Sequence, residues 1–374
     1  MTKVTFETAT LADAIKKADR VAPGKGKAFD EAGGIVMELL PDQNLVALRA
    51  TNQEIFYREW ITAEIELGEG VEGPVSWRLP NMMVTPVITS LPIGTGKTVT
   101  FTEKESGVNN YIEFKSGRTK GKFNLMDMSY YPDWSVFDPD GLVQVADLGG
   151  RLSQVEWAVS KDTPPMTGVN FNGTAVRATD KYRLAQVPLE VPGLDEDNMV
   201  TVPGGMLGSI LKQTGEVMVG FTEHQMLLMP NESTQIRLVL IGGQYPPVER
   251  VMKRDHTESV SFKKAELLEV VNRAIIAAGG DRLPTLKMYL GGELINVLVK
   301  SETSSILDAI EVPGACLHDR IEIMFTPKNI IDAISNAPNE TVTMHYLLTD
   351  NKIVRIDGGT GYEAWAVVRK FSDA

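Results

Sequence analysis

The sequence predicts an α+β fold built from three repeated domains, and three observations support this. Prolines suited to the first turn of a helix recur at Pro80, Pro203 and Pro327, which are 123 and 124 residues apart. An even spacing of this kind is typical of homologous domains in tandem. Runs that alternate polar and apolar residues between the predicted helices indicate strands with one solvated face. A hairpin sequence that occurs twice favours a duplicated unit.

The first predicted helix of each domain is amphipathic. Residues 9–20 carry an apolar stripe on one face, and Thr10 is the predicted N-cap. Residues 148–160 and 263–276 repeat this pattern. Because each helix is apolar on one side only, we expect each to cover a sheet without being enclosed.

The second predicted helix of each domain begins near one of the three prolines. These helices are expected over residues 78–91, 203–214 and 326–337. Proline suits the first helical position because its missing N–H has no partner there. Pro86 lies inside the first of them, where it is expected to kink or shorten the helix.

The predicted strands lie between the helices. Residues 97–104, 216–223 and 294–301 are three clear examples of alternation. The central hairpin spans residues 169–189, where Thr179-Asp180 is a predicted tight turn, because such side chains bond nearby backbone N–H groups. Residues 47–58 share its Ala-x-Arg-Ala-Thr-(Asp/Asn) core.

Two similar segments mark the predicted domain boundaries. SYYPDWSVF (129–137) and GQYPPVERV (243–251) each place an aromatic residue before proline, followed by an apolar anchor. We interpret them as exits from one domain to the next, with linkers near 135–143 and 250–258. The predicted domains are therefore residues 1–138, 139–254 and 255–374.

Length and composition bound the class of protein. A chain of 374 residues suits two or three domains, and 43% hydrophobic with 23% charged residues is ordinary for a soluble globular protein. No run approaches the ~20 apolar residues of a membrane helix, and the N-terminus lacks a signal-peptide core. The single Cys316 excludes an internal disulfide, so we expect a cytoplasmic protein. Four scattered histidines give no metal-ligand spacing, and no metal or other cofactor is expected.

No sequence motif indicates catalysis. GTGKT at 94–98 looks like part of a phosphate-binding loop, but Leu91 stands where that motif needs glycine. We therefore expect a turn between a helix and a strand. The usual dinucleotide, hydrolase and metalloprotease signatures do not occur. The sequence does not show whether any of its many carboxylates converge on a cleft.

The predicted helices carry a net positive charge, in contrast to the rest of the chain. The net charge is −12, yet the six helical segments sum to +4, which leaves −16 for the rest of the chain. One interpretation is that solvated helix faces simply carry lysine. The other is that the helices share a surface that faces a polyanion, while strands and loops face solvent.

Several motifs, in order along the chain, resemble the bacterial sliding clamp, the beta subunit of DNA polymerase III. The most specific is GTAVRATDKYRLA (173–185), followed by ATNQE (50–54), YYPDW (130–134) and GGQYPPVERV (242–251). The resemblance covers essentially the whole chain. It implies the DNA clamp fold, in which each of three domains lays two inner helices against outer antiparallel sheets.

The resemblance also implies a function without catalysis. Two chains would join head to tail as a homodimeric ring around duplex DNA, without sequence preference. The ring would tether DNA polymerase, the clamp loader and repair proteins through short peptide motifs. Weak phosphate contacts would permit sliding, whereas contacts to base edges would stall it.

Site residues follow from the resemblance. It places a partner-peptide pocket between the second and third domains, with Arg183 orienting the peptide; the matching positions are Met166, Thr179, Tyr182, Arg183, Leu184, Pro246, Val251, Thr326 and Val368. For Leu184 and Val251, plain core packing is the alternative. Matching DNA contacts fall at Lys25 or Lys27 and near Lys161, which could equally be solvated loop lysines.

Three departures from the family pattern concern the partners. The chain ends in WAVVRKFSDA (365–374) where a Met-Pro-Met-type tail is usual, and Lys181-Tyr182 replaces Gly-His. Residues 294–312 lack the Ala-Thr-Asp turn. We expect the ring to survive and partner preference to change, as in a divergent clamp of viral origin. The alternatives are a ring- or shell-forming structural protein without DNA, and a metal-assisted hydrolase with Asp180 as a ligand.

Overall fold

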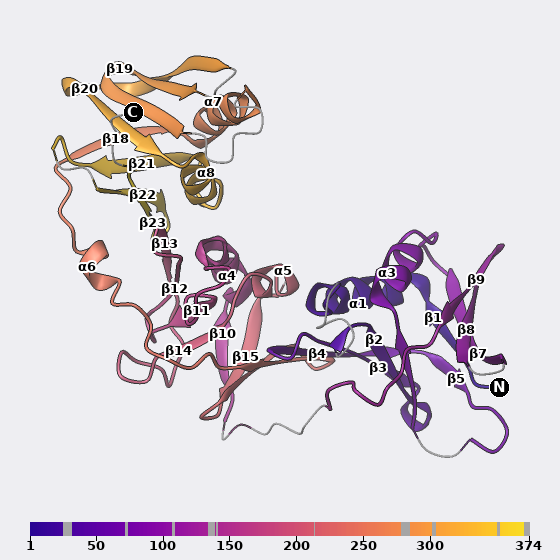
Figure 1. The fold of residues 1–374 in the computed structure, drawn as a ribbon. Helices are drawn as coiled ribbons and strands as arrows, with labels where there is room; N and C mark the ends of the chain where they lie inside the picture. The colour runs from indigo at the N-terminus through magenta and orange to yellow at the C-terminus, as the bar shows by residue number, and fades with distance from the viewer. Residues whose placement is uncertain are drawn as a thin grey trace. The chain divides into compact units, whose positions relative to one another are not determined.

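The computed structural model divides the chain into two compact units (Figure 1). The first unit comprises Met1–Asp147 and Gln213–Leu240, and the second comprises Leu148–Lys212 and Ile241–Ala374. The structure describes residues 1–24, 32–71, 74–106, 109–133, 139, 141–212, 214–277, 285–300, 304–349 and 352–369. Among these residues, no helix combines the length and the apolarity of a transmembrane segment.

The first unit contains two antiparallel sheets. The smaller has the order β5-β1-β7-β8-β9, with β1 at Lys3–Glu7, β5 at Glu64–Glu66, β7 at Thr98–Ser106, β8 at Asn109–Ser116 and β9 at Thr119–Asn124. The larger has the order β10-β15-β16-β17-β4-β3-β2-β6, with β2 at Ile35–Leu40, β3 at Leu45–Thr51, β4 at Ile55–Thr62, β6 at Val75–Leu79, β10 at Val143–Ala146, β15 at Glu216–Phe221, β16 at Gln225–Asn231 and β17 at Thr234–Val239. The predicted strands at 97–104 and 216–223 are confirmed as β7 and β15.

The second unit also contains two antiparallel sheets. Eight strands follow the order β14-β11-β12-β13-β23-β22-β21-β18, with β11 at Gly168–Phe171, β12 at Ala175–Thr179, β13 at Arg183–Pro188, β14 at Val200–Pro203, β18 at Glu258–Lys263, β21 at Thr341–Tyr346, β22 at Ile353–Gly359 and β23 at Tyr362–Val367. A long hairpin forms the other sheet, with β19 at Thr285–Lys300 and β20 at Ser305–Phe325.

Helices pack in pairs on these sheets. In the first unit, α1 (Thr8–Val21) packs against α3 (Asn81–Thr89), and a short 3-10 turn, η1, spans Pro41–Gln43. The apolar stripe of α1, which includes Leu11 and Ile15, is fully buried over β3 and β4. Burial of that apolar stripe is the main interaction that holds α1 on the sheet.

The second unit contains two further helix pairs. α4 (Leu148–Val155), extended by η2 (Glu156–Ala158), packs against α5 (Leu207–Ile210), and α7 (Lys264–Ala277) packs against α8 (Pro327–Ser335), as Figure 1 shows. The remaining helix, α6 (Glu249–Met252), is a single turn. All six predicted helical segments therefore contain a helix, and the predicted α+β class is confirmed.

The two hairpins that share a sequence core also share their turn geometry. Asn52 Oδ1 accepts hydrogen bonds from the N–H groups of Glu54 (3.1 Å) and Ile55 (2.7 Å). Asp180 Oδ1 accepts from Tyr182 and Arg183, both at 3.0 Å. The intervening Gln53 and Lys181 both have left-handed backbones, with φ of 77° and 80°. The duplication predicted from sequence is thus present in the structure, and the predicted Thr179-Asp180 turn is confirmed.

The two eight-stranded sheets are built alike. Strands β2, β3, β4 and β6 of one have the same connectivity as β11, β12, β13 and β14 of the other, and each set joins four later strands. In one sheet the junction is β4–β17, and in the other it is β13–β23. Each large sheet thus takes strands from two of the predicted domains, and the boundaries 1–138, 139–254 and 255–374 stay a prediction.

Several local predictions need correction. Thr10 is inside α1, where its hydroxyl donates to Glu7 Oε2 at 3.0 Å, and Glu7 itself is the residue before the helix. Of the three prolines, Pro327 alone begins a helix, since Pro80 precedes α3 and Pro203 ends β14. Pro86 lies within α3, which continues to Thr89.

The predicted linkers have different outcomes. Residues 134–138 lie outside the described residues. Near 250–258, the chain forms α6 before it enters β18. GTGKT at 94–98 is confirmed as a turn between α3 and β7, in which the Lys97 N–H donates to the Gly94 carbonyl at 3.0 Å.

Candidate functional site

A pocket lies in the second unit beside the junction of β13 and β23. In this antiparallel pair Leu184 stands opposite Trp365, and Arg183 stands opposite Ala366. The empty space of the pocket is about 300 Å³, and its lining comprises Thr179, Lys181, Tyr182, Arg183, Leu184, Val248, Val251, Ile353, Trp365 and Val367.

The floor of the pocket is apolar. Leu184 and Trp365 are 3% and 2% exposed and pack in one cluster with Tyr245 and Val248. The partly buried Val251 and Ile353 lie against this cluster. The strand pairing supplies Leu184 and Trp365, while the chain around α6 supplies the valines. The result is a concave apolar surface that can accept an apolar side chain.

The turn before β13 forms the polar rim. Tyr182 is 65% exposed, and its carbonyl accepts a hydrogen bond from the Val367 N–H at 2.8 Å. The Thr179 hydroxyl donates to the Arg183 carbonyl at 2.8 Å. These bonds fix the backbone of the turn to its own strand and to β23, so the rim has a defined shape.

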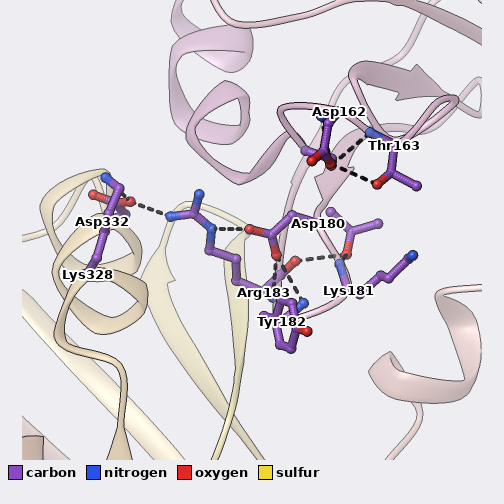
Figure 2. Close-up of polar contacts among 10 residues, drawn as sticks. Asp162, Thr163, Asp180, Lys181, Tyr182, Arg183, Lys328 and Asp332 are labelled. Carbon is purple, nitrogen blue, oxygen red and sulfur yellow. Dashed lines mark hydrogen bonds and ion pairs between the residues drawn. The ribbon is translucent and has the colours of Figure 1, made fainter. Parts of the chain in front are cut away.

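Arg183 ties this turn to α8 (Figure 2). Its Nε donates to Asp180 Oδ2 at 2.8 Å, and its Nη1 binds Asp332 of α8. Lys328 Nζ binds the same Asp332 carboxylate at 2.7 Å. The guanidinium also lies 5.4 Å from the centre of the Trp157 ring. The charge of Arg183 is therefore balanced by two carboxylates, and Arg183 is also one of the residues that line the pocket.

A second ion pair holds α6, which contributes Val251 to the pocket. Arg177 is buried, its Nε donates to Asn170 Oδ1 at 2.9 Å, and its Nη1 binds Glu249 at the start of α6. Partial burial raises the pKa of Glu249, but the hydrogen bond and charge of Arg177 outweigh this and lower it overall. The pair fixes α6, and with it Val251, beside β12 and β13.

The equivalent junction of the first unit is filled. There Phe56 of β4 stands opposite Arg237 of β17, at the positions that Leu184 and Trp365 occupy in the second unit. The Arg237 guanidinium lies 3.9 Å from the centre of the Phe56 ring, and both side chains are buried. A stacked pair of this kind leaves no apolar hollow between these two residues.

The structure brings together five of the nine predicted pocket residues. Thr179, Tyr182, Arg183, Leu184 and Val251 all line the pocket. Within the described residues the other four lie outside its lining: Met166 is buried, Pro246 is half-buried before α6, Thr326 precedes α8, and Val368 follows β23. Whether any of the nine contacts a partner stays a prediction.

Five lining residues were missed from the sequence. They are Lys181, Val248, Ile353, Trp365 and Val367. Val248 lies one helical turn before Val251, so the spacing of the two valines was a usable signal. Trp365 and Val367 lie there because β13 pairs with β23, and Ile353 lies there because β22 pairs with β23 opposite Val367. The pairing of β13 with strands so distant in sequence leaves no local signal.

Of the three lysines predicted to contact DNA, the structure describes one, Lys161. Lys25 and Lys27 lie outside the described residues. Lys161 is exposed in the loop after η2, next to a turn in which the Thr163 hydroxyl donates to Asp162 Oδ1 at 3.0 Å (Figure 2). Its exposure leaves Lys161 accessible to an anionic partner.

The charge of the helices is lower than the sequence suggested. Arg78, counted with the second predicted helix, lies in β6, where it is buried and its Nε donates to the Gly33 carbonyl at 2.9 Å. Lys212 follows α5, and Lys263 belongs to β18. Lys17 of α1 binds Asp13 at 2.7 Å and Glu59 at 2.9 Å. Exposed Lys16 and Arg20 of α1 carry the remaining positive charge of that helix.

Asp180 has a structural role in this arrangement. Its Oδ1 accepts two backbone N–H groups and its Oδ2 accepts Arg183 Nε, so both oxygens are engaged. Across the described ranges, no three His, Cys, Asp or Glu side chains are grouped as metal ligands would be. The structure thus provides no support for a metal site at Asp180.

Comparison with known proteins finds beta sliding clamps among the relatives of this chain. No protein-family model matches the sequence. The beta sliding clamp of Staphylococcus aureus (strain Mu50) is 27% identical over 293 residues, which cover 72% of this chain and 73% of that protein. The beta sliding clamp of Streptococcus pneumoniae serotype 4 is 24% identical over 275 residues, covering 70% and 71%.

Solved structures extend the likeness to the full length. The DNA polymerase III beta subunit of Thermotoga maritima matches with a TM-score of 0.78 and 19% identity over 100% of both chains. The DNA polymerase sliding clamp of Bacillus subtilis matches with a TM-score of 0.76 and 21% identity, over 99% of this chain and 100% of that one. The chain is therefore a distant homologue of the beta sliding clamps, and it has the DNA clamp fold over its whole length.

Proposed function

We propose that this protein is a processivity factor of DNA replication, a ring-shaped clamp that encircles duplex DNA and tethers a DNA polymerase. The observation that carries the proposal is the match to beta sliding clamps, by sequence over 72% of the chain and by structure over all of it. The protein would act without catalysis or cofactors, since a closed ring keeps its polymerase on the template by topology. A cytoplasmic location fits this role.

The three predicted domains supply the ring in this proposal. Each would contribute one helix pair, namely α1 with α3, α4 with α5, and α7 with α8. We propose that these pairs face the DNA and that the sheets lie outside them. Contacts to phosphate from lysines such as Lys25, Lys27 and Lys161 would be weak, salt-sensitive and independent of sequence. Such contacts let the ring slide.

A head-to-tail homodimer closes the proposed ring. β9 is the last strand of its sheet and carries exposed Lys120 and Lys122. The β19–β20 hairpin forms a separate two-stranded sheet and carries exposed Glu293 and Glu311. Strands of opposite charge with unpaired edges can extend a sheet from one chain into the next.

Exposed apolar side chains lie on helices of the same two units as these edges. Met83 on α3 is 61% exposed and Ile276 on α7 is 79% exposed. α3 belongs to the first unit, as β9 does. α7 packs against β19 and β20. Burying such side chains between subunits is favourable, which supports an interface formed by α3 with β9 and α7 with β20.

The pocket at the β13–β23 junction is the proposed tether for partners. DNA polymerase and the clamp loader would each insert apolar side chains of a short peptide against Leu184, Trp365 and Val251. The rim at Tyr182 and Arg183 would orient the peptide backbone. This arrangement lets different partners use the same site in turn.

Retention on circular DNA tests the proposal. The protein is loaded onto a nicked circle with a clamp loader, and the bound fraction is followed by gel filtration before and after the circle is linearised. We expect retention on the circle, release after linearisation, and a solution mass near twice 41.0 kDa. Equal loss from circles and linear molecules would contradict the clamp and favour a ring-forming structural protein that does not act on DNA.

A further inference from the structure

Lys181 is an exposed cation on the rim of the proposed peptide pocket. It lines the pocket together with its neighbour Tyr182, and its backbone is left-handed, with φ of 80°. The turn holds it there, because Asp180 Oδ1 accepts the N–H groups of the two following residues. The Lys181 side chain therefore starts from a fixed point at the pocket mouth.

The other charges around the pocket are compensated. Arg183 is balanced by Asp180 and Asp332, and Glu249 is balanced by Arg177. Lys181 forms no ion pair with any residue that the structure describes. In Figure 2 its side chain extends away from the Arg183 network. The mouth of an apolar pocket thus carries one positive charge without a counter-charge.

We propose that this pocket prefers partner peptides that carry an Asp or Glu side chain next to their apolar anchors, and that Lys181 binds that carboxylate. The inference rests on the proposed peptide-binding function of the pocket. The apolar floor would supply most of the affinity, as in other peptide grooves. The rim charge would select among peptides with the same anchors, because complementary charge contributes to specificity more than to affinity.

The size of the preference follows from the exposure of Lys181. An ion pair between solvent-exposed groups contributes about 0.2–1 kcal/mol, and the upper part of this range, about 0.4–1 kcal/mol, corresponds to a preference of about two- to fivefold. Salt screens such a pair, so the preference should fall as the ionic strength rises from about 0.05 to about 0.3 M. Binding through the apolar floor should change much less with salt.

Fluorescence anisotropy on the full chain tests the preference. The probes are short peptides with blocked ends and the same Leu and Phe anchors, with Asp, Asn or Lys directly before the anchors in one set and directly after them in another. In at least one set we expect the Asp peptide to bind about two- to fivefold more tightly than the Asn peptide, and the Lys peptide to bind most weakly. Equal affinities in both sets would overturn the inference.

Variants at Lys181 identify the residue responsible. Lys181→Gly removes the charge and suits the left-handed backbone, so the turn should fold as before and the Asp and Asn peptides should bind equally. Lys181→Glu should reverse the order and favour the Lys peptide. Lys212→Ala is the matched control, since Lys212 is exposed in the same unit but does not line the pocket. A preference that persists in Lys181→Gly would overturn the assignment to Lys181.

A separate variant distinguishes failure of the inference from failure of the pocket. Leu184→Asp places a charge on the apolar floor and should abolish binding of every peptide. If no peptide binds the unaltered protein, or if Leu184→Asp binds as well as the unaltered protein does, both the pocket and the charge preference are overturned. If binding depends on Leu184 but not on peptide charge, the pocket stands and the role of Lys181 is overturned.

Discussion

Arg183 and Asp332 form an ion pair that joins the turn before β13 to α8, across 149 residues of sequence. Both side chains are mostly buried, at 10% and 17% exposure. The same guanidinium binds Asp180, which builds the turn that carries Lys181 and Tyr182. One side chain thus connects the pocket rim, the strand that forms the pocket floor and a helix of the third predicted domain. The shape of the pocket should depend on this pair even where partners never touch it.

Removal of Asp332 should therefore destabilise the second unit. Asp332→Ala leaves a mostly buried guanidinium with one carboxylate, and the expected loss is about 1–3 kcal/mol of unfolding free energy. Lys328→Ala is the matched control, because its exposed ammonium binds the same carboxylate and should contribute less than about 1 kcal/mol. Urea titration followed by tryptophan fluorescence measures both, since Trp157 and Trp365 lie in this unit. Equal effects of the two variants would show that Arg183 does not depend on Asp332.

Leu184→Ala should weaken polymerase or peptide binding about tenfold while leaving the dimer intact. The variant removes part of the pocket floor, and because Leu184 is buried it also costs about 2–4 kcal/mol of stability. Leu228→Ala controls for that cost, since Leu228 is fully buried in β16 of the first unit. Anisotropy at a temperature where both variants are folded gives the affinities. Equal loss of affinity in the two variants would remove Leu184 from the binding site.

The sequence predicted the helices and strands whose conformation depends mainly on neighbouring residues in the chain. The stripe of Leu11 and Ile15 predicted α1, and alternation predicted β7 and β15. The prediction was wrong at Pro203, which ends β14. Its neighbour Val202 pairs with Val169 of β11, and the left-handed Gly205 (φ of 94°) follows. The pairing of β14 with β11 and the turn at Gly205 thus shorten α5 to Leu207–Ile210. The even spacing of the prolines could not predict this shortening.

The part of the site that was predictable lies mostly on one hairpin, with Val251 of α6 as the exception. The motif at 173–185 identified Arg183 and Leu184, which line the pocket. Trp365 was missed because its place depends on the register of β23 against β13. Asp332 was missed for a related reason: it is the one carboxylate of α8, but only the packing of α8 brings it to Arg183. The periodicity of the sequence does not determine which distant strands pair, in which register they pair, or how α8 packs.

Ile276→Asp should convert the proposed dimer into a monomer. The side chain is 79% exposed within one chain, so the substitution should leave the stability of the chain nearly unchanged. At a subunit interface the new carboxylate would be buried without a partner, which costs several kcal/mol. Met199→Asp is the control, because Met199 is an exposed apolar residue outside the proposed interface. Sedimentation equilibrium should give a mass near 41.0 kDa for Ile276→Asp and about twice that for the control. A dimeric Ile276→Asp protein would contradict the proposed interface.

Glu156 should make stability depend on pH in a defined direction. Its carboxylate accepts the N–H groups of Leu207 (2.9 Å) and Gly208 (3.0 Å) at the start of α5. Burial raises the pKa of Glu156 from 4.5 to about 7, although these backbone hydrogen bonds lower it in part. A pKa that is higher in the folded chain means that folding favours the protonated form. The stabilisation is thus complete below about pH 4.5 and is lost as the pH rises through about 7.

Glu156→Gln isolates this effect because glutamine stays neutral at every pH while one oxygen can still accept an N–H. The unfolding free energy of the unaltered protein, taken relative to the variant, should fall by about 2–3 kcal/mol between pH 4.5 and pH 8, since one pKa unit corresponds to about 1.4 kcal/mol. Urea titrations of both proteins at intervals across this range give the difference directly, and other titrating groups cancel in it. A difference that stays constant with pH would show that the backbone hydrogen bonds at α5 fully offset the burial of Glu156.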